Sequence, residues 1–241
     1  LAAAAAEVGT ALHAAVAREL MADVPVGIFA SGGLDSSLLV ALASEHFPRG
    51  GIRTYTIAFG DPSYDESGPA AVVTQHFGTR HRAVAADPVN LRRAFDVVGD
   101  RLDEPLGDPA VLPTYLLSEA ARQDVKVILS GEGADELFGG YPTYLGHRAA
   151  GAYAALPGWL RGLTQRAVFA LPSSPGKVTT EFLLKRFVAH AALAPVDRHF
   201  EWFGALGPLA LDSVLGPAAA PALAAARAGL AERGALAAVA G

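Results

Sequence analysis

A short stretch, SGGLDSS at residues 31–37, brings together the groups that bind a phosphate chain. It directly follows the apolar run VPVGIFA at residues 24–30, which has the length and composition of a buried strand. Glycines let backbone N–H groups face an anion with no side chain between them. The positive N-terminal end of a following helix favours negative charge. The pattern therefore predicts a phosphate-binding turn between a strand and a helix.

Two other phosphate-binding motifs do not fit this sequence. A Walker loop ends in Gly-Lys-Ser/Thr, but the Gly-Lys pair at residues 176–177 is followed by valine and lies far from any predicted strand. A dinucleotide fingerprint needs three spaced glycines, and GEGADE from Gly131 offers only the first two. What remains is a turn whose amides and hydroxyls hold pyrophosphate while a carboxylate holds Mg²⁺. The alternative is that Asp35 or Ser36 only caps the helix.

A second glycine-rich turn starts at Ser130, directly after the apolar run VKVIL. It carries three acids, which are Glu132, Asp135 and Glu136. Because ligands bind beyond the carboxyl ends of parallel strands, the two turns are expected to line one crevice. The simplest result is Mg²⁺ held between Asp35 and Asp135. The alternative is that Asp135 and Glu136 lie in the first turn of a short helix and favour its dipole.

The rest of the first 144 residues alternates between short apolar runs and helical patterns. The runs of strand length are residues 24–30, 53–59, 80–86 and 125–130, and the helical patterns are residues 4–22, 36–46, 66–77, 89–98 and 112–122. Strands that alternate with helices predict an α/β fold, in which a parallel twisted sheet carries helices on both faces.

Beyond about Tyr144 the strand-like runs end, and alanine, leucine, arginine and isolated prolines predict a helical region. Its clearest helix is residues 179–193. Its apolar side chains, Phe182, Leu183 and Phe187, are expected to be buried. Its basic side chains, Lys185 and Arg186, are expected on a solvated face. We predict a first domain at residues 1–150 and an incomplete helical region at residues 151–241.

The composition excludes several classes of protein. The chain has 241 residues and a formal net charge of −5, which does not suit a surface that follows a nucleic-acid backbone. It has no cysteine, which excludes disulfides, thiolate metal sites and thiol nucleophiles. No apolar run approaches the roughly 18 residues of a membrane helix, and the N-terminus lacks the basic segment of a signal peptide. We therefore predict a cytoplasmic protein with no nucleic-acid or membrane partner.

These motifs resemble those of the N-type ATP pyrophosphatases, and in particular the synthetase domain of glutamine-hydrolysing asparagine synthetases. SGGLDSS is similar to their pyrophosphate loop. Three further stretches match in order, which are TIAFGDPSYDES, DEPLGDPAVLPTYLLSEAA and VKVILSGEGADELFGGYPTY. The similarity runs from about Ala17 to Tyr144, and more loosely to Phe200. The resemblance implies an adenine nucleotide alpha hydrolase-like fold that uses ATP and Mg²⁺.

The resemblance also implies an activity and a set of site residues. ATP would activate the side-chain carboxylate of aspartate as an acyl adenylate, pyrophosphate would leave, and ammonia would attack to give asparagine. The phosphate-binding residues are Ser31, Gly32, Gly33, Asp35, Ser36 and Ser37, and backbone groups of Phe29, Ile57, Ser130 and Gly131 bind adenine. Asp35 and Asp135 hold the metal, and Glu132 supports the adenylate chemistry and accepts a proton from the amine. For Phe29 and Ile57 the alternative is ordinary strand core.

The sequence departs from the family in several places. No glutaminase domain is recognised, so ammonia would come from a domain absent from this chain, and a homodimer is left open. The lysine that lies near the phosphates is not recognised, and neither Lys177 nor Lys185 takes its place. At Arg80-His81-Arg82 the family often has two histidines, so His81 is predicted to be a surface residue without a role.

Other functions remain open at this point. A related ATP-dependent cyclase of the beta-lactam or lasso-peptide type would activate another carboxylate with the same turns. A noncatalytic nucleotide-binding homologue has no reason to retain all three acids, Asp35, Glu132 and Asp135. A tRNA-modifying pyrophosphatase needs a basic surface or thiol chemistry. The start at Leu1 and the alanine-rich end lead us to expect a piece of a longer synthetase, with a shortened homologue as the alternative.

Overall fold

The computed structural model describes residues 2–104, 106–174, 176, 178–204 and 215–232. The chain forms two compact units, Leu1–Ala134 and Asp135–Gly241. The domain boundary between residues 150 and 151 stays a prediction. Within the described residues, none of the helices combines the length and the apolar character needed to cross a membrane.

The first unit is built on a parallel sheet, as the alternating pattern predicted. Its strands are β1 (Val26–Phe29), β2 (Arg53–Ala58), β3 (Arg80–Ala85) and β4 (Val127–Leu129). They lie in the order β3-β2-β1-β4, and each neighbouring pair is parallel. From β1 the chain passes to β2 and then β3 on one side, and it returns to place β4 on the other side of β1. The direction of winding therefore reverses between β1 and β4.

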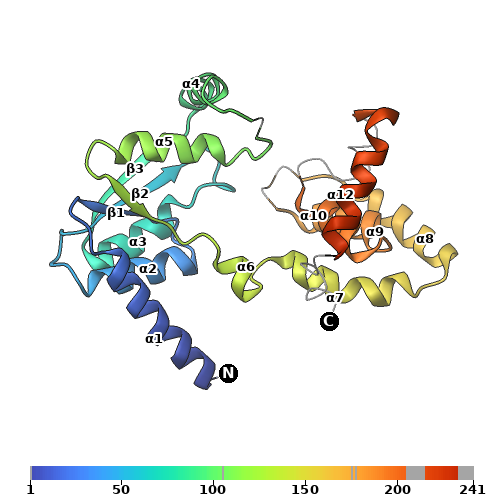
Figure 1. The fold of residues 1–241 in the computed structure, drawn as a ribbon, viewed down its shortest axis with the longest axis horizontal. Helices are drawn as coiled ribbons and strands as arrows, with labels where there is room; N and C mark the ends of the chain where they lie inside the picture. Colours follow the sequence, from blue (N-terminus) through green and yellow to red (C-terminus); the bar gives the residue numbers. More distant parts are fainter. Residues whose placement is uncertain (1, 105, 175, 177, 205–214, 233–241) are drawn as a thin grey trace. The chain divides into compact units, whose positions relative to one another are not determined.

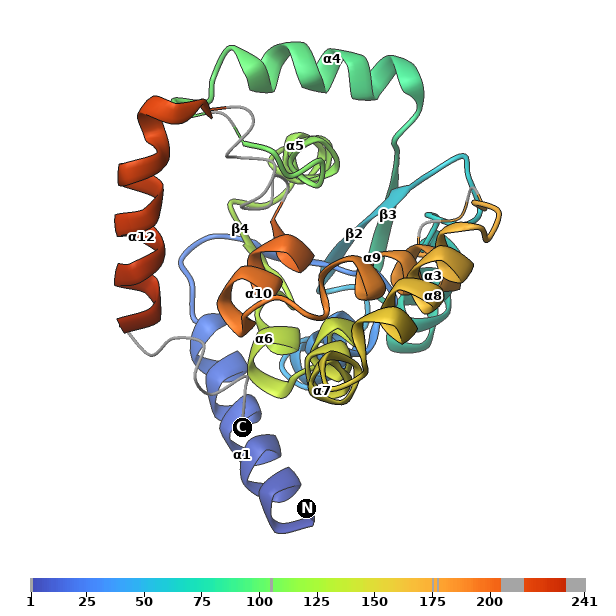
Figure 2. The same ribbon diagram turned by 90° about the vertical axis from the view of Figure 1, so that its right-hand side faces the viewer.

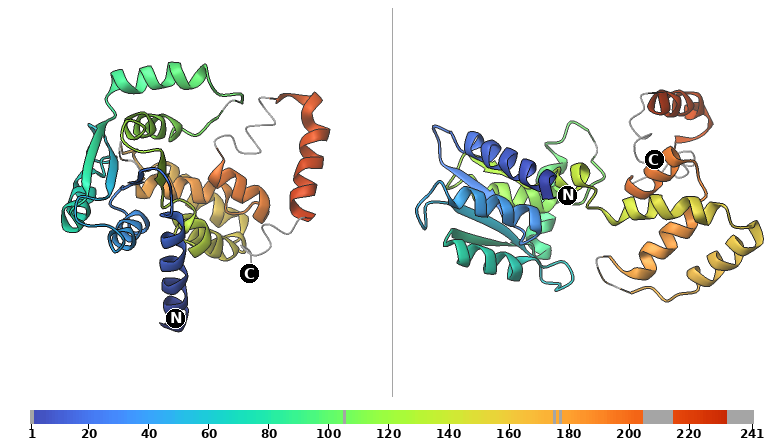
Figure 3. Two further views of the ribbon diagram at one scale, coloured as in Figure 1. Left: turned by 60° about the vertical axis from the view of Figure 1, so that its left-hand side comes forward. Right: turned by 90° about the horizontal axis from the view of Figure 1, so that it is seen from below.

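Helices cover both faces of this sheet, which confirms the predicted fold class. The helices are α1 (Ala2–Glu19), α2 (Leu34–Ser44), α3 (Ser67–Phe77), α4 (Pro88–Gly99) and α5 (Val111–Ala121). Helices α1, α2 and α3 lie side by side on one face (Figure 3), and α5 covers the other (Figure 1). Helix α4 packs against the outer side of α5 (Figure 2).

The two-residue period of β2 explains this layering. Tyr55 is buried against the end of α5 and the segment that leads to β4, where it packs with Ala121 and Val125. Its neighbours Thr54 and Thr56 are also buried, and they point to the opposite face of the sheet. A strand that buries both faces must satisfy its polar side chains internally, and both threonine hydroxyls are hydrogen-bonded.

The described residues of the second unit form helices and no strand, as predicted. Its helices are α6 (Ala134–Phe138), α7 (Pro142–Ala154), α8 (Gly158–Phe169), α9 (Thr180–His190), α10 (Pro195–Phe203), a 3-10 turn (Pro217–Ala219) and α12 (Ala220–Glu232). Residues 205–214 and 233–241 of the predicted helical region lie outside the described residues.

Helix α9 corrects two details of the sequence prediction. Phe187 packs on Trp202 with 6.0 Å between ring centroids, as expected for a buried residue. The prediction was wrong for Phe182 and Leu183, which are 47% and 41% exposed, because α8 and α10 cover other sides of the helix. The basic face is not simply solvated either. Lys185 Nζ donates to the Leu171 carbonyl at 2.7 Å, and Arg186 Nη2 donates to the Glu201 carbonyl at 2.8 Å.

A buried arginine holds α7, α9 and α10 together. Arg198 Nε donates to Nδ1 of His147 at 3.1 Å, and its Nη1 donates to the Ala191 carbonyl at 3.2 Å. The guanidinium also lies 5.6 Å from the ring of Trp202. Burial and the neighbouring positive groups lower the pKa of His147 to about 4. A neutral imidazole is required here because its Nδ1 accepts a hydrogen bond.

Candidate functional site

The two turns singled out by the sequence follow adjacent strands. The turn at residues 31–33 leaves the end of β1, and Ser130 follows the end of β4. Strand β1 pairs with β4, and Ile28 lies opposite Leu129. The winding of the sheet reverses between these two strands, and open α/β sheets bind ligands at this position.

The first turn is held in shape by its own serines. The N–H of Ser31 donates to Ser36 Oγ at 3.1 Å, and the N–H of Gly33 donates to Ser31 Oγ at 3.2 Å. Ser36 Oγ in turn donates to the Gly33 carbonyl at 3.3 Å. Ser36 is buried, so its hydroxyl braces the turn from inside. The prediction that it contacts phosphate stays a prediction.

The alternative that Asp35 or Ser36 caps the helix is wrong. The N-cap of α2 is Gly33, and no side chain provides a capping bond there. Asp35 lies in the first turn of the helix and is half-buried. The first N–H groups of an α-helix have no intrahelical acceptor. Without a capping side chain, these groups are available to a ligand at the start of α2.

Gly32 allows the first turn to touch the start of α3. Its φ is +78°, and a Cβ at this position would lie 2.5 Å from the Ala70 nitrogen and 2.6 Å from the Pro69 carbonyl carbon. A side chain is therefore excluded both by the backbone conformation and by backbone atoms of α3. The sequence correctly predicted a glycine-dependent turn, but only the fold shows which element it contacts.

Gly131 brings the second turn against the first. A Cβ on Gly131 would lie 3.0 Å from the Ser36 backbone nitrogen and 3.1 Å from the Asp35 Cβ. The turns after β1 and β4 are therefore in contact, as the sequence predicted. The close approach involves the first helical turn that carries Asp35. Glycines in such turns let backbone N–H groups face an anion with no side chain between them.

The segment after β2 fixes the start of α3. Asp65 Oδ1 accepts hydrogen bonds from the N–H groups of Phe59 and Ser67, both at 3.2 Å, and Oδ2 accepts from Ser67 Oγ at 2.8 Å. These bonds lower the pKa of Asp65. Sequence reasoning assigned no role to this residue, although an Asp-x-Ser pattern before a helix is a turn signal.

Phe29 and Ile57 lie at the ends of β1 and β2, and both are half-buried. The Phe29 side chain packs against the Tyr55 cluster, and the Ile57 side chain packs against a cluster that contains Leu116. The strand-core alternative is therefore right for these side chains. The adenine contacts predicted for their backbone groups, and for Ser130 and Gly131, stay predictions.

The acids of the second turn lie on either side of the boundary between the two units. Glu132 belongs to the first unit and is exposed, whereas Asp135 and Glu136 lie in the first turn of α6 in the second. Tyr141 donates to Glu136 Oε1 at 2.7 Å and lowers the pKa of that carboxyl. The shared metal site of Asp35 and Asp135 therefore stays a prediction.

A Mg²⁺ ion that binds together with substrate phosphates does not need a complete set of protein ligands. In the described part of the chain, no group of three acidic, histidine or cysteine side chains could hold an ion by itself. Mg²⁺ is commonly bound by one or two carboxylates together with substrate phosphates. A single carboxylate such as Asp35, beside a turn lined by glycines, fits that mode of binding.

His81 is not the surface residue that the sequence predicted. Its Nδ1 lies 3.1 Å from the Thr54 hydroxyl, on the strand next to it, and burial lowers its pKa. The prediction of a surface position failed because the sequence does not show that β3 pairs with β2. In that pairing Thr54 lies opposite His81. The contact is part of the packing between the two strands. Lys177, which the prediction also left without a role, lies outside the described residues.

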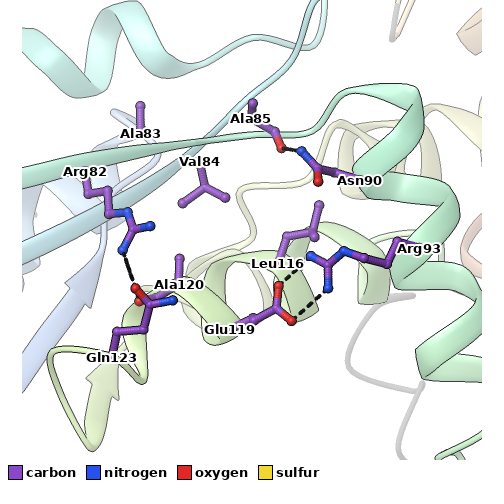
Figure 4. Close-up of a pocket in the computed structure, with 10 residues that line it drawn as sticks. All are labelled: Arg82, Ala83, Val84, Ala85, Asn90, Arg93, Leu116, Glu119, Ala120 and Gln123. Atoms are coloured by element: carbon purple, nitrogen blue, oxygen red, sulfur yellow. Dashed lines mark hydrogen bonds and ion pairs between the residues drawn. The ribbon is translucent and has the colours of Figure 1, made fainter.

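Two pockets of the first unit lie away from the turns. One of about 220 Å³ is bounded by β3, α4 and α5, where Arg93 pairs with Glu119 at 2.5 Å and Arg82 donates to Gln123 at 3.1 Å (Figure 4). A second pocket of about 640 Å³ lies between the end of α4 and the start of α5. Neither is lined by the predicted site residues. The Arg93–Glu119 bonds instead join α4 to α5, and they lower the pKa of Glu119 to about 2.

A parallel sheet with glycine-rich turns at its reversal point defines an open α/β protein of the kind that binds ligands at this position. Residues 7–205 match the family described as asparagine synthase, and the chain belongs to that family. The resemblance found in the sequence motifs is therefore confirmed.

Two curated relatives agree with this assignment. The chain is 42% identical over 138 residues to a Mycobacterium tuberculosis protein provisionally named a glutamine-hydrolyzing asparagine synthetase, covering 57% of this chain and 21% of that protein. It is 32% identical over 166 residues to asparagine synthetase (glutamine-hydrolyzing) 1 of Bacillus subtilis, covering 69% of this chain and 26% of the relative. An NH3-dependent NAD synthetase from Campylobacter jejuni, solved with nitrate, superposes with a TM-score of 0.41 at 12% identity, covering 56% and 59% of the two chains. The chain thus spans about a quarter or less of the length of the two asparagine synthetases described above.

Proposed function

We propose that this chain provides the ATP-binding and carboxylate-activating part of an asparagine synthetase. The observation that carries the proposal is the contact of Gly131 with the turn at Asp35 and Ser36. Two glycine turns in contact beyond the ends of β1 and β4 offer backbone donors to a triphosphate. Family membership supports aspartate as the acid and ammonia as the amine.

In the first step, a carboxylate oxygen of aspartate attacks the α-phosphorus of ATP. The bond from that phosphorus to the bridging oxygen breaks, and pyrophosphate leaves with the bonding electrons. The N–H groups at the start of α2 receive the negative charge of the leaving group. A bound Mg²⁺ would supply further charge neutralisation, with Asp35 as a ligand and Asp135 as its predicted partner.

In the second step, the nitrogen of ammonia attacks the acyl carbon of the adenylate, and AMP leaves. The attacking nitrogen must lose a proton, and a carboxylate close to the reaction can accept it. Glu132 follows Gly131 directly and its side chain is exposed, so its carboxylate is accessible to a ligand. We assign this proton transfer and the support of the adenylate to Glu132.

The ammonia would be supplied by a glutaminase domain, as the names of the relatives suggest. Both curated relatives described above are named as glutamine-hydrolyzing, and each is several times longer than the matched segment. Free ammonia added to the reaction should replace that domain. We propose a cytoplasmic enzyme, where ATP and aspartate are both available.

The test is ATP–pyrophosphate exchange in the natural full-length protein, with and without aspartate. Exchange of labelled pyrophosphate into ATP that requires aspartate supports the proposal. Exchange with another carboxylic acid and not with aspartate would identify a related cyclase instead. ATP binding with no exchange for any acid tried would indicate a noncatalytic homologue.

A further inference from the structure

Thr56 lies beside the first turn, and none of the sequence motifs assigns it a role. It is 2% exposed, so its hydroxyl is shielded from water and needs a partner within the protein. That partner is the carbonyl oxygen of Ala30, to which the Thr56 hydroxyl donates. Ala30 is the last residue before the turn that starts at Ser31.

Both backbone polar groups of Ala30 are held by β2. Its N–H donates to the Tyr55 carbonyl at 2.9 Å, and its carbonyl accepts from Thr56. Ala30 itself is 2% exposed. The next N–H along the chain, that of Ser31, donates to Ser36 Oγ. The start of the turn is thus anchored on one side to β2 and on the other to α2.

The hydrogen bond from Thr56 also takes the place of a backbone hydrogen bond between β1 and β2. The paired register of β1 and β2 ends at Phe29 opposite Tyr55. In a regular parallel ladder the next bond would run from the Ile57 N–H to the Ala30 carbonyl. Among the described residues, that carbonyl is bonded to the Thr56 hydroxyl instead. The Ile57 N–H therefore remains available at the end of β2, beside the turn.

We propose that Thr56 is a positioning residue for nucleotide binding, because its hydroxyl anchors the start of the first turn and leaves the Ile57 backbone to the ligand. This inference rests on the proposed function, since the ligand it concerns is ATP. The hydroxyl does not touch the reacting atoms, and it acts through Ala30 and Ile57.

The test uses Thr56→Val, which keeps the shape of the side chain and removes the hydroxyl. Thr54→Val is a matched control, because Thr54 is buried on the same face of β2 and bonds to Thr79 and His81 rather than to the turn. Thr56→Ser restores a hydroxyl. The measurements are the Kd for ATP with Mg²⁺ and the amide hydrogen exchange of residues 30–37 without nucleotide, with circular dichroism to confirm folding.

Thr56→Val is expected to raise the Kd for ATP about tenfold, the effect of leaving one buried acceptor unpaired, and to speed exchange in residues 30–37. Thr56→Ser should keep the natural affinity and exchange, and Thr54→Val should leave both unchanged. The inference is overturned if Thr56→Val matches the natural protein, or if Thr54→Val has an equal effect. A natural protein that does not bind ATP would refute the proposed function, and the exchange rates would still decide whether Thr56 orders the turn.

Discussion

Gly131 lies against the backbone of Ser36, with 3.0 Å between the position of a Gly131 Cβ and the Ser36 nitrogen. The neighbouring atoms on this side are backbone atoms and the Asp35 Cβ, which cannot rotate away. Strands β1 and β4 are adjacent, so their turns start next to each other. The absence of a side chain at Gly131 then lets the backbones meet.

Gly131→Ala should weaken nucleotide binding by forcing the two turns apart. Overpacking of this kind typically costs about 1–3 kcal/mol, so the Kd for ATP is expected to rise about tenfold or more. Isothermal titration measures the change. Gly60→Ala is the control, because a Cβ there has no atom within 4 Å. Equal affinities for Gly131→Ala and the natural protein would show that the contact has no part in binding.

Asp35→Ala should abolish pyrophosphate release while the fold is kept. Asp35 provides no capping bond to α2, so the free energy of unfolding should change by less than about 0.5 kcal/mol. Radiolabelled ATP follows the release of pyrophosphate, and thermal melting follows the fold. An unchanged rate of release would remove Asp35 from the mechanism. Ser44→Ala, at the end of α2, is a control for substitutions within the same helix.

Glu132→Gln should slow the attack of ammonia on the adenylate more than it weakens ATP binding. The amide keeps the size of the side chain and loses its capacity to accept a proton, which typically costs about 10²–10⁴-fold in rate. Single-turnover assays with aspartate and ammonia measure the amide-forming step, and equilibrium titration measures the Kd for ATP. Losses of equal size in rate and in affinity would contradict the role assigned to this carboxylate.

The second unit should lose stability in mild acid because of His147. Its pKa is lowered from 6.5 to about 4, so between these values the unfolded chain binds a proton that the folded chain does not. Stability is therefore fully present above pH 6.5 and declines as the pH falls toward 4. Between pH 7 and pH 5 we expect a loss on the order of 1 kcal/mol.

Tryptophan fluorescence in urea can measure this loss, because Trp159 and Trp202 both belong to the second unit and the chain contains 2 tryptophans. His147→Gln keeps an acceptor for Arg198 and cannot titrate, so its unfolding midpoint should fall less over the same pH range. A pH dependence as steep as that of the natural chain would assign the effect to other groups, such as His199.

The sequence by itself determined the fold class and the two turns. The apolar runs have strand length, and the glycine-rich stretches follow them directly, so β1, β4 and their turns could be placed from local pattern alone. The exposure of Phe182 and the packing of His81 could not be predicted from local pattern. Both depend on which element lies next to α9 or to β3, and local pattern does not contain that choice.

Only the tertiary structure decided which residues the turns contact. The order β3-β2-β1-β4 places Gly131 against Ser36, and it places the Thr56 hydroxyl beside the Ala30 carbonyl. Thr56 reads in sequence as an ordinary strand residue, because β-branched side chains favour strands whether or not they bond to anything. Hydrogen bonds between segments distant in sequence depend on strand order and register, and these are set by packing of the whole sheet.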